Sequence, residues 1–379
     1  MTAVLDGIVV ADFSRVLAGP LATMTLADLG ATVIKVERPG VGDETRQWGP
    51  PWTPTTSAYF EAANRSKLSV ELDLDVPADR EVAANLACEA DVVVENFRPG
   101  SLDARGLGYD AVAARNPGVV YCSVSGFGPG SALPGYDFLV QAVGGLMSIT
   151  GHPESPPAKV GVALVDVLTA KDAVAGILAA LLERTTSGRG QHIRVNLLSS
   201  LLGSLANQAA SYLATGASPG RLGNRHPSIA PYETLECADG QLAVACGNDA
   251  QFRRLAGAVG LPALAEDDRF RTNPARVAHR SELVRELESA LRREDVDTWV
   301  GRLERAGVPA GRVGDVGSAF ALATRLGLEP RVPLGDGAMD QVRHAVSYSR
   351  TPVTGYRRPP RLGEHNELVR ATYATRSTR

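Results

Sequence analysis

The sequence predicts an α/β protein with a Rossmann-like, doubly wound large domain and a smaller α+β domain. Apolar runs of strand length recur about every 25–35 residues with segments of helical periodicity between them, which is the doubly wound pattern. The composition shifts at residues 216–229 to a stretch rich in Gly, Pro and polar residues, as is typical of a linker. With 379 residues, the chain is long enough for two domains.

The first elements predict a βαβ unit. Apolar runs at Gly7–Asp12 and Ala31–Val36 predict two strands, and a helical segment opened by Gly19-Pro20 lies between them. The connecting turn reads SRVLAGP and lacks the GxGxxG fingerprint of dinucleotide-binding proteins. Glu37 stands where a ribose-binding acid would follow the second strand, but without the glycines we do not expect NAD binding.

The same alternation continues along the chain. The glycine-rich stretch Ser125–Gly130 lacks the Lys-Ser/Thr ending of a phosphate-binding loop, so we interpret it as a flexible loop beside a site. The further predicted strands are Ser69–Asp73, Asp91–Glu95, Val119–Val124, Val160–Val165 and His192–Leu197. Predicted helices include Pro77–Glu89, Phe138–Ile149 and Ser199–Ala214.

The remainder of the chain predicts the second domain. Tyr232–Cys237 and Gln241–Cys246 flank Asp239-Gly240, which indicates a β-hairpin, and charged helical segments with solvated faces follow from Ala250 to about Ala306. The predicted boundaries are a large domain at 1–198, a linker helix and loop at 199–225, a small domain at 226–315, and a return linker with the C-terminal part of the large domain at 316–379.

Composition excludes several classes of protein. A formal net charge of −3 argues against general nucleic-acid binding, which needs a basic domain or stripe. The four cysteines form no CxxC pair and are expected to be reduced thiols, and we predict no metal site. No signal-peptide pattern opens the chain, and no apolar run approaches the roughly 18 residues of a membrane span. We therefore expect a cytoplasmic protein with no nucleic-acid or membrane partner.

The stretch Gly161–Gln191, GVALVDVLTAKDAVAGILAALLERTTSGRGQ, contains the most informative residue. Its opening apolar run predicts a strand, Asp166 follows, and residues with helical periodicity lead to the stop signal Ser187-Gly188. Asp166 is thus expected at the carboxyl end of a strand, where open α/β sheets bind ligands. Since Asp is a favoured N-cap residue, a purely structural role as the cap of the helix is the alternative.

Several segments together resemble the family III CoA-transferases of the formyl-CoA and carnitine type, a group that also includes the α-methylacyl-CoA racemases. The resemblance covers nearly the whole chain in order and is more specific than any single motif. Besides the Asp166 stretch, it is carried by LDGIVVADFSRVLAGP (5–20), LADLGATVIKVERPGVGDETR (26–46), NRSKLSVELDLD (64–75), ADVVVENFRPGSLDARGLGYD (90–110), PGYDFLVQA (134–142), NRHPSIAPYETLECADG (224–240) and RLGEH (361–365).

The resemblance implies that Asp166 is a covalent nucleophile that moves CoA from an acyl-CoA to a carboxylic acid. Its carboxylate would attack the thioester to give a mixed anhydride, the freed thiolate would form an aspartyl-CoA thioester, and the acceptor acid would reverse the sequence. A carboxylate suits this chemistry because it is ionised at neutral pH and its intermediates are readily reversed. We expect the adjacent helix amino end to help keep Asp166 ionised, so capping and catalysis are compatible.

The resemblance also implies a binding site for the ADP head and the arm of CoA, with the CoA thioester as co-substrate and no other cofactor. Arg38 suits a phosphate because guanidinium groups bind phosphate well, and its alternative is an ordinary exposed loop arginine. The family often has a basic residue at position 104, where this chain has Ala104 followed by Arg105. The implied CoA-binding residues are Val16, Ala18, Arg38, Leu72, Asp73, Leu74, Asp75, Asn96, Phe97, Arg98, Arg105 and Tyr136.

Residues 224–240 are similar to members that act on dicarboxylates, which implies succinyl-CoA or another dicarboxyl-CoA as donor and a glutarate-like or malate-like acceptor. The long glycine run of formyl-CoA transferase is absent, so formate with oxalate is not the expected substrate pair. Arg225 is a further candidate for binding the acceptor carboxylate, with a surface role as the alternative. The implied substrate-side residues are Arg15, Leu17, Asp137, His226, Gly247 and Asn248.

Two other functions stay open, an α-methylacyl-CoA racemase and a non-catalytic CoA-binding protein. The racemases have a His at the position of Tyr136, and a tyrosine, whose pKa is ordinarily near ~10, is a poor general base at neutral pH. Tyr136 is expected either beside Asp166 or as a core aromatic. Finally, the resemblance implies an interlocked homodimer, in which each chain forms a ring threaded by the other.

Overall fold

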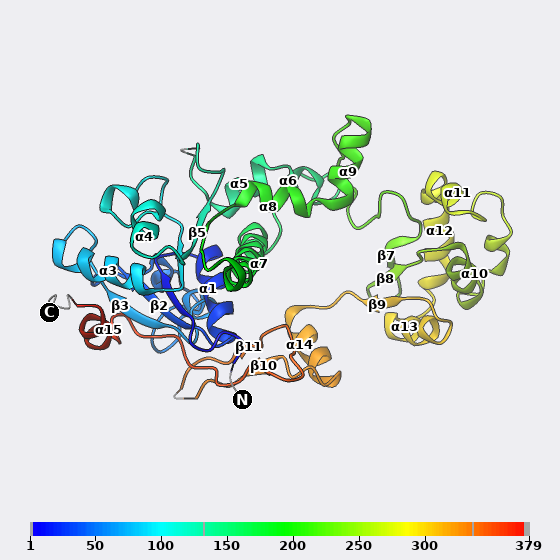
Figure 1. Ribbon diagram of the computed structural model, residues 1–379. Helices are drawn as coiled ribbons and strands as arrows, with labels where there is room; N and C mark the ends of the chain where they lie inside the picture. The colour runs from blue at the N-terminus through cyan, green and yellow to red at the C-terminus, as the bar shows by residue number, and fades with distance from the viewer. Residues whose placement is uncertain (1–2, 132, 336, 375–379) are drawn as a thin grey trace. The chain divides into compact units, whose positions relative to one another are not determined.

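The computed structural model describes residues 3–131, 133–335 and 337–374, and the chain divides into two compact units (Figure 1). The first unit comprises Met1–Leu146, Lys159–Ala217 and Glu329–Arg379, and the second comprises Met147–Ala158 and Ser218–Leu328. The chain therefore leaves the first unit twice and returns to it twice.

A six-stranded parallel sheet forms the centre of the first unit, which confirms the predicted fold class. The strands lie in the order β3–β2–β1–β4–β5–β6, so β2 and β3 lie on one side of β1 and β4, β5 and β6 lie on the other. Ligands of such sheets bind at this switch point, outside the carboxyl ends of the strands. The strands are β1 (Val9–Asp12), β2 (Thr32–Glu37), β3 (Leu68–Glu71), β4 (Val92–Glu95), β5 (Val120–Ser125) and β6 (His192–Asn196).

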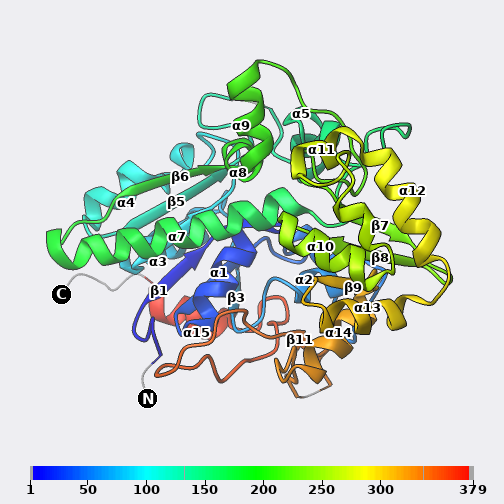
Figure 2. The same cartoon turned by 90° about the vertical axis from the view of Figure 1, so that its right-hand side faces the viewer.

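Helices cover both faces of this sheet because its strands are apolar on both sides. In β4, Val92 and Val94 belong to the core beneath one set of helices, whereas Val93 belongs to the core on the opposite face. Both views show α7 lying beside α1 (Figures 1 and 2). One face is covered by α1 (Ala18–Asp28), α7 (Leu164–Ser187) and α8 (Leu197–Ser204), and the other by α3 (Pro77–Glu89), α4 (Tyr109–Arg115) and α15 (Asn366–Tyr373).

Shorter elements complete the first unit, apart from α6, which lies mostly in the second unit. The strands β10 and β11 pair in antiparallel orientation. These elements are α2 (Ala58–Glu61), α5 (Asp137–Val143), α6 (Leu146–Ile149), α9 (Ala206–Thr215), β10 (Arg331–Val332), β11 (Gln341–Val342) and the 3₁₀ turns η1 (Glu44–Gln47) and η2 (Asp103–Arg105).

Two predicted helices are each divided in two. The helix expected at Phe138–Ile149 breaks after α5 because Gly145 adopts a left-handed backbone with φ of +89°. The helix expected at Ser199–Ala214 breaks between α8 and α9, where Ala206 has a φ of +44°. Hydrophobic periodicity continues across both breaks, so the pattern alone predicts one helix where the backbone forms two.

The second unit contains a three-stranded antiparallel sheet with the predicted hairpin. The hairpin consists of β7 (Tyr232–Glu236) and β8 (Gln241–Ala245), and β9 (Ala310–Arg312) pairs with β8. The helices here are α10 (Asp249–Ala258), α11 (Asn273–Ala278), α12 (Arg280–Leu291), α13 (Val296–Arg305) and α14 (Val316–Arg325), with the 3₁₀ turn η3 (Pro262–Ala265). Across the described parts of both units, every helix is too short or too polar to cross a bilayer.

Candidate active site

Asp166 lies in the first turn of α7, with only 8% of its surface exposed. The strand expected at Val160–Val165 is wrong, because this segment is a loop that leads directly into the helix. The side chain of Gln141 holds the loop: it accepts a hydrogen bond from the Val160 N–H (2.9 Å) and donates one to the Val162 carbonyl (3.3 Å). Asp166 therefore follows a loop that is held by a side chain rather than by sheet pairing.

The amino end of α7 is capped by a residue from another helix. The N-cap position itself is Ala163, so the alternative that Asp166 caps its own helix is also wrong. Asp137, the first residue of α5, accepts hydrogen bonds at Oδ1 from the backbone N–H groups of Val165 (2.8 Å) and Asp166 (3.3 Å). Asp137 thus satisfies donors that have no partner within the helix.

Burial, and second the negative charge of Asp137, raise the pKa of Asp166 to about 7. Burial acts because an ionised carboxylate loses hydration in the wall of the site. A helix amino end favours the ionised form and so opposes these two effects, and its help in keeping Asp166 ionised stays a prediction. At neutral pH Asp166 therefore occurs both protonated and ionised, as suits a group that must change its charge during a reaction.

Asp166 lines a cavity of about 800 Å³, which we call the Asp166 cavity. Its wall includes the predicted site loop at Ser125 and Gly126 and the segment that runs through Leu133 and Pro134 to Gly135. The two loops touch, since a Cβ on Gly126 would lie 2.4 Å from the Cα of Gly135. The predicted residues that line this cavity are Arg15, Val16, Leu17, Ala18, Asn96, Phe97, Arg98, Tyr136, Asp137 and Asp166.

Tyr136 is not a core aromatic residue. It is 61% exposed, precedes α5 at the N-cap position and lies in the cavity wall with Asp137 and Asp166. No histidine is among the described residues that line this cavity. The group most suited to accept or donate a proton near neutral pH in this wall is therefore Asp166 itself.

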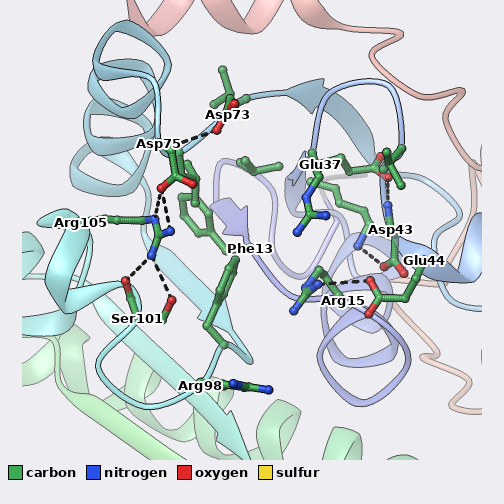
Figure 3. Close-up of a pocket in the computed structure, with 18 residues that line it drawn as sticks. Phe13, Arg15, Glu37, Asp43, Glu44, Asp73, Asp75, Arg98, Ser101 and Arg105 are labelled. Atoms are coloured by element: carbon green, nitrogen blue, oxygen red, sulfur yellow. Dashed lines mark hydrogen bonds and ion pairs between the residues drawn. The ribbon is translucent and has the colours of Figure 1, made fainter.

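A second cavity of about 540 Å³ lies at the carboxyl ends of the first strands, and we call it the arginine cavity (Figure 3). It shares the lining residues Arg15, Glu44, Phe97 and Arg98 with the Asp166 cavity, so the two adjoin. The predicted CoA-binding residues in its wall are Arg38, Leu72, Asp73, Leu74, Asp75, Phe97, Arg98 and Arg105.

The arginines of this cavity differ in how they are engaged. Arg105 donates to Asp75 (2.7 Å) and to the carbonyl of Ser101 (3.0 Å), as Figure 3 shows. Within the described residues, the guanidinium groups of Arg38 and Arg98 have no hydrogen bond or ion pair with another residue. These two are thus available to an anionic ligand, whereas Arg105 is already paired.

Arg15 lines both cavities and has an incomplete set of partners. Its Nη1 lies 3.3 Å from Glu44 Oε2, while its Nε is buried and has no hydrogen-bond partner in the described structure. Its guanidinium also lies over the ring of Phe97, 5.3 Å from the centroid. Glu44 was not predicted from the sequence, because only the folded chain brings η1 against the turn after β1.

A buried group of charges lies beneath the site and was also missed. The pairs are Lys67 with Asp12 (3.0 Å), Lys35 with Asp43 (2.9 Å) and Arg46 with Glu37 (2.7 Å). Glu37 is only 4% exposed, so its ion pair explains its position without a ribose-binding role. The sequence signal was available, since a lysine between the apolar residues Ile34 and Val36 of a strand needs a buried partner.

Burial alone would raise the pKa of the Asp12 carboxyl, but the ammonium groups of Lys67 and Lys35 outweigh it and hold the pKa at about 2. Hydroxyl donors from Ser14 and Thr23 act in the same direction. Asp12 therefore stays ionised inside the protein near neutral pH, where its charge is balanced by the lysines.

The remaining predicted residues belong to the second unit. The Nδ1 of His226 accepts a hydrogen bond from the Ser228 N–H (3.1 Å), and Asn248 caps α10 by accepting one from the Gln251 N–H (2.9 Å). The N–H of Gly247 donates to the Gln251 side chain (2.7 Å). These contacts give each residue a local structural role, and the substrate-side role of all three stays a prediction, as does that of Arg225.

The first unit therefore combines a buried, ionisable carboxylate with two adjoining cavities that contain arginines. Within the residues that the structure describes, no group of three or more His, Cys, Asp or Glu side chains could hold a metal ion. The arrangement is suited to covalent or acid–base chemistry by Asp166 on an extended anionic ligand.

Comparison with known proteins agrees with this geometry. The sequence profile of CoA-transferase family III matches residues 5–366. The succinate–glutarate CoA-transferase of Agrobacterium fabrum is 42% identical, with 98% of this chain and 96% of that protein aligned. The human succinyl-CoA:glutarate CoA-transferase is 40% identical over 96% of this chain and 85% of its own length. A crystal structure of a CaiB/BaiF family protein from Brucella suis superposes with a TM-score of 0.88 at 43% identity, covering 98% of this chain and 100% of that one.

Proposed function

Since this chain belongs to CoA-transferase family III, we propose that it moves CoA from succinyl-CoA or another dicarboxyl-CoA to a second carboxylic acid through a covalent intermediate on Asp166. The observation that carries the proposal is the position of Asp166 in a cavity that adjoins an arginine-containing one. The names of the relatives from Agrobacterium fabrum and human support succinyl-CoA as donor and glutarate as the first acceptor to test.

The reaction consists of two exchanges at the Asp166 carboxylate: CoA passes first from the donor acid to Asp166 and then from Asp166 to the acceptor acid. An Asp166 oxygen attacks the thioester carbonyl, the C–S bond breaks, and CoA thiolate leaves a mixed anhydride. The thiolate then attacks the Asp166 carbonyl of this anhydride, which releases the donor acid and leaves an aspartyl-CoA thioester. The acceptor carboxylate attacks the aspartyl-CoA thioester, which frees CoA thiolate and leaves a second mixed anhydride. The thiolate then attacks the acceptor's carbonyl in this anhydride, which forms the new acyl-CoA and regenerates the Asp166 carboxylate.

Each cavity is assigned one part of the substrates. Arg38 and Arg98 would bind the phosphates of CoA, because their guanidinium groups are free and line the arginine cavity. Arg15 would bind a carboxylate of the acceptor or donor acid, since it lies between the two cavities and its contact with Glu44 is long. Asn96 would hold the protein backbone and not CoA, because both ends of its amide already bind the backbone of Arg15.

The racemase alternative needs a second proton-transfer group beside Asp166. Tyr136 occupies the position where the racemases have a His, and the described residues that line the Asp166 cavity include no histidine. This favours the transferase. A non-catalytic CoA-binding protein differs from the transferase and the racemase because it would bind CoA without forming a product.

The deciding experiment incubates the protein with succinyl-CoA and a panel of acids, including glutarate and malate, and measures the masses of the products and of the protein. We expect a new acyl-CoA, and an adduct on Asp166 that hydroxylamine traps. Asp166→Ala should lose at least about 10³-fold in rate, since the nucleophile is gone. The matched control is Asp172→Ala, an exposed residue of the same helix, which should keep full activity.

Two outcomes would overturn the proposal. One is the absence of CoA transfer to any acid of the panel together with the absence of an adduct on Asp166. The other is exchange of an α-proton with deuterated solvent in the absence of an acceptor acid, which would establish a racemase.

We also propose that two chains associate as an interlocked homodimer, as the family resemblance implies. Light scattering during size-exclusion chromatography should give a mass near twice that of one chain, 39.8 kDa. A monomer mass at micromolar concentration would contradict this.

A further inference from the structure

The turn Ser14–Leu17 joins β1 to α1 and forms part of the wall that also contains Asp166. Its third residue, Val16, has a φ of +70°. A β-branched side chain in this left-handed region is strained, because its Cβ branches crowd the backbone, and such a conformation persists only where surrounding groups fix it. The groups that fix the turn are therefore part of how this wall keeps its shape.

Side chains from four other places bind the backbone of this turn. Asp12 Oδ1 accepts a hydrogen bond from the Ser14 N–H (2.9 Å), and Lys35 Nζ donates to the Ser14 carbonyl (2.8 Å). Asn96 accepts from the Arg15 N–H (2.9 Å) and donates to the Arg15 carbonyl (2.7 Å). Five consecutive backbone polar groups are thus held by side chains once the Val16 N–H is included.

The Val16 N–H donates to the carboxylate of Asp43, whose two oxygens lie 3.2 and 3.3 Å away. This is the contact at the strained residue itself. Asp43 is in turn fixed by Lys35, which lies 2.9 Å from its Oδ2, and by Thr45, whose N–H and hydroxyl donate to its Oδ1 at 3.0 and 2.7 Å. The side chains of Lys35 and Asp43 are fully buried.

Lys35 therefore links both sides of the turn, because one ammonium group contacts the Ser14 carbonyl and the Asp43 carboxylate. The backbone N–H of Asp43 donates to Glu37 Oε2 (3.0 Å), and Glu37 is paired with Arg46, which fixes the segment that carries Asp43. None of Asp43, Glu37 and Arg46 is among the described residues that line the Asp166 cavity, although Asp43 and Glu37 line the arginine cavity, so their connection to Asp166 is through the turn.

We propose that Asp43, held by Lys35, is a positioning residue of the acyl-CoA site: it keeps the strained Val16 turn in the shape that the bound thioester needs. The inference rests on the proposed function, because it takes the Asp166 cavity to be the place where acyl-CoA binds. Asp43 lines the arginine cavity, but its side chain is fully buried, so it acts on the substrate through the backbone of residues 15–18 rather than by contact.

The test substitution is Asp43→Asn, which keeps the size of the side chain and removes its charge. Its amide nitrogen must replace one carboxylate oxygen and then faces a backbone N–H, either that of Val16 or that of Thr45. We expect the Val16 turn to open. The amides of residues 14–18 should exchange with deuterium at least tenfold faster, and the KM for acyl-CoA should rise about tenfold with a smaller change in kcat.

Asp28→Asn is the matched control, because it breaks another buried ion pair of the same unit. Asp28 pairs with Arg65 at 2.6 Å, is 6% exposed, and lines neither the Asp166 cavity nor the arginine cavity. It should lower the melting temperature as Asp43→Asn does, while the exchange of residues 14–18 and the KM stay at the wild-type values.

A double variant, Lys35→Met with Asp43→Asn, separates folding from positioning. It leaves no unpaired buried charge, so it should recover stability relative to Asp43→Asn alone. Its KM should stay high because the Val16 N–H keeps only one, uncharged oxygen as acceptor and the Ser14 carbonyl loses its Lys35 donor. Wild-type exchange rates at residues 14–18 in Asp43→Asn would overturn the inference and leave the proposed function intact. Absence of any CoA transfer by the wild-type protein would overturn the proposed function. Faster amide exchange in Asp43→Asn would still establish that Asp43 fixes the turn Ser14–Leu17.

Discussion

The carboxylate of Asp137 accepts a hydrogen bond from the backbone N–H of Asp166 and, after burial, is the second cause of the raised pKa of the Asp166 side chain. One residue thus fixes the start of the helix that carries the proposed nucleophile and opposes its ionisation. The two effects are separable, since the hydrogen bond needs one oxygen whereas the electrostatic effect needs the charge.

Asp137→Asn should therefore lower the pKa of Asp166 from about 7 and keep the cap of α7 at Oδ1, although its amide nitrogen replaces the oxygen that accepts from Gln141 Nε2 (2.7 Å). Removing a like charge favours the ionised carboxylate, but burial, the larger cause, remains, so the pKa stays above the ordinary value. The acid limb of kcat/KM for acyl-CoA should move to lower pH by about 0.5–1 unit. A pH–rate profile measures this, with Asp172→Asn as control, and a limb that moves to higher pH would contradict it.

Asp166 should cost the protein stability at high pH. An aspartate in an unfolded chain titrates near ~3.9, whereas Asp166 titrates at about 7 when folded, so the folded state binds the proton more tightly between these values. The stability from this group is present below pH ~4 and is lost as the pH rises to ~7. Asp166→Asn should stabilise the fold by up to about 4 kcal/mol at pH 8 and by less at pH 5.

Thermal unfolding of this variant at pH 5 and pH 8 provides the measurement. Asp172→Asn, in an exposed position on the same helix, should shift neither melting temperature by more than a degree or so. An Asp166→Asn variant that is less stable than the wild type at pH 8 would show that the ionised Asp166 carboxylate does not destabilise the folded protein.

Arg38 and Arg98 should contribute to CoA affinity separately from Arg105, which is already paired with Asp75. Arg38→Gln and Arg98→Gln should each raise the KM for acyl-CoA about tenfold, the loss expected for one charge-assisted hydrogen bond to phosphate. The KM for the acceptor acid should be unchanged, and the KM for acyl-CoA should depend less on salt. Arg189→Gln, at an exposed arginine that lines neither cavity, is the control. Equal effects on both substrates would indicate general damage to the site instead.

Much of the fold was predictable because short stretches of sequence determine many of its helices and strands. Pro77 at the first position of a helix and the uninterrupted apolar run at Val92–Val94 give the correct elements for α3 and β4. The error at Val160–Val165 has a physical cause, since a short apolar run looks the same whether it enters a sheet or packs against a helix start. Only Gln141, distant in sequence, decides between the two by binding this loop.

The residues of the candidate site were predictable where they lie in the segments that resemble the family. Sixteen predicted residues line the two cavities. The four that do not, Arg225, His226, Gly247 and Asn248, belong to the second unit. The capping of α7 by Asp137 and the contact of Glu44 with Arg15 were not predictable, because each joins residues far apart in the chain. The raised pKa of Asp166 was missed for the same reason, since burial depends on what packs around a residue.

The buried lysine beneath the site offers a last prediction. Lys67 Nζ contacts Asp12 Oδ2 (3.0 Å), the Pro20 carbonyl (2.9 Å) and Asn64 Oδ1 (2.9 Å), and the Lys67 and Asp12 side chains are fully buried. Lys67→Met leaves Asp12 short of its nearest counter-charge and should destabilise the fold by about 3–5 kcal/mol. Because the folded pKa of Asp12 is depressed to about 2, its contribution to stability is present above pH ~4 and lost as the pH falls, so the variant should lose most at neutral pH.

Denaturant unfolding at pH 7 measures this loss, and Lys171→Met, an exposed lysine on α7, is the control for the substitution itself. Combining Lys67→Met with Asp12→Asn should restore part of the stability, because the damage in the single variant comes from an uncompensated carboxylate rather than from lost packing. If the double variant is no more stable than Lys67→Met alone, the hydrogen bonds of Lys67 to Pro20 and Asn64 matter more than its charge.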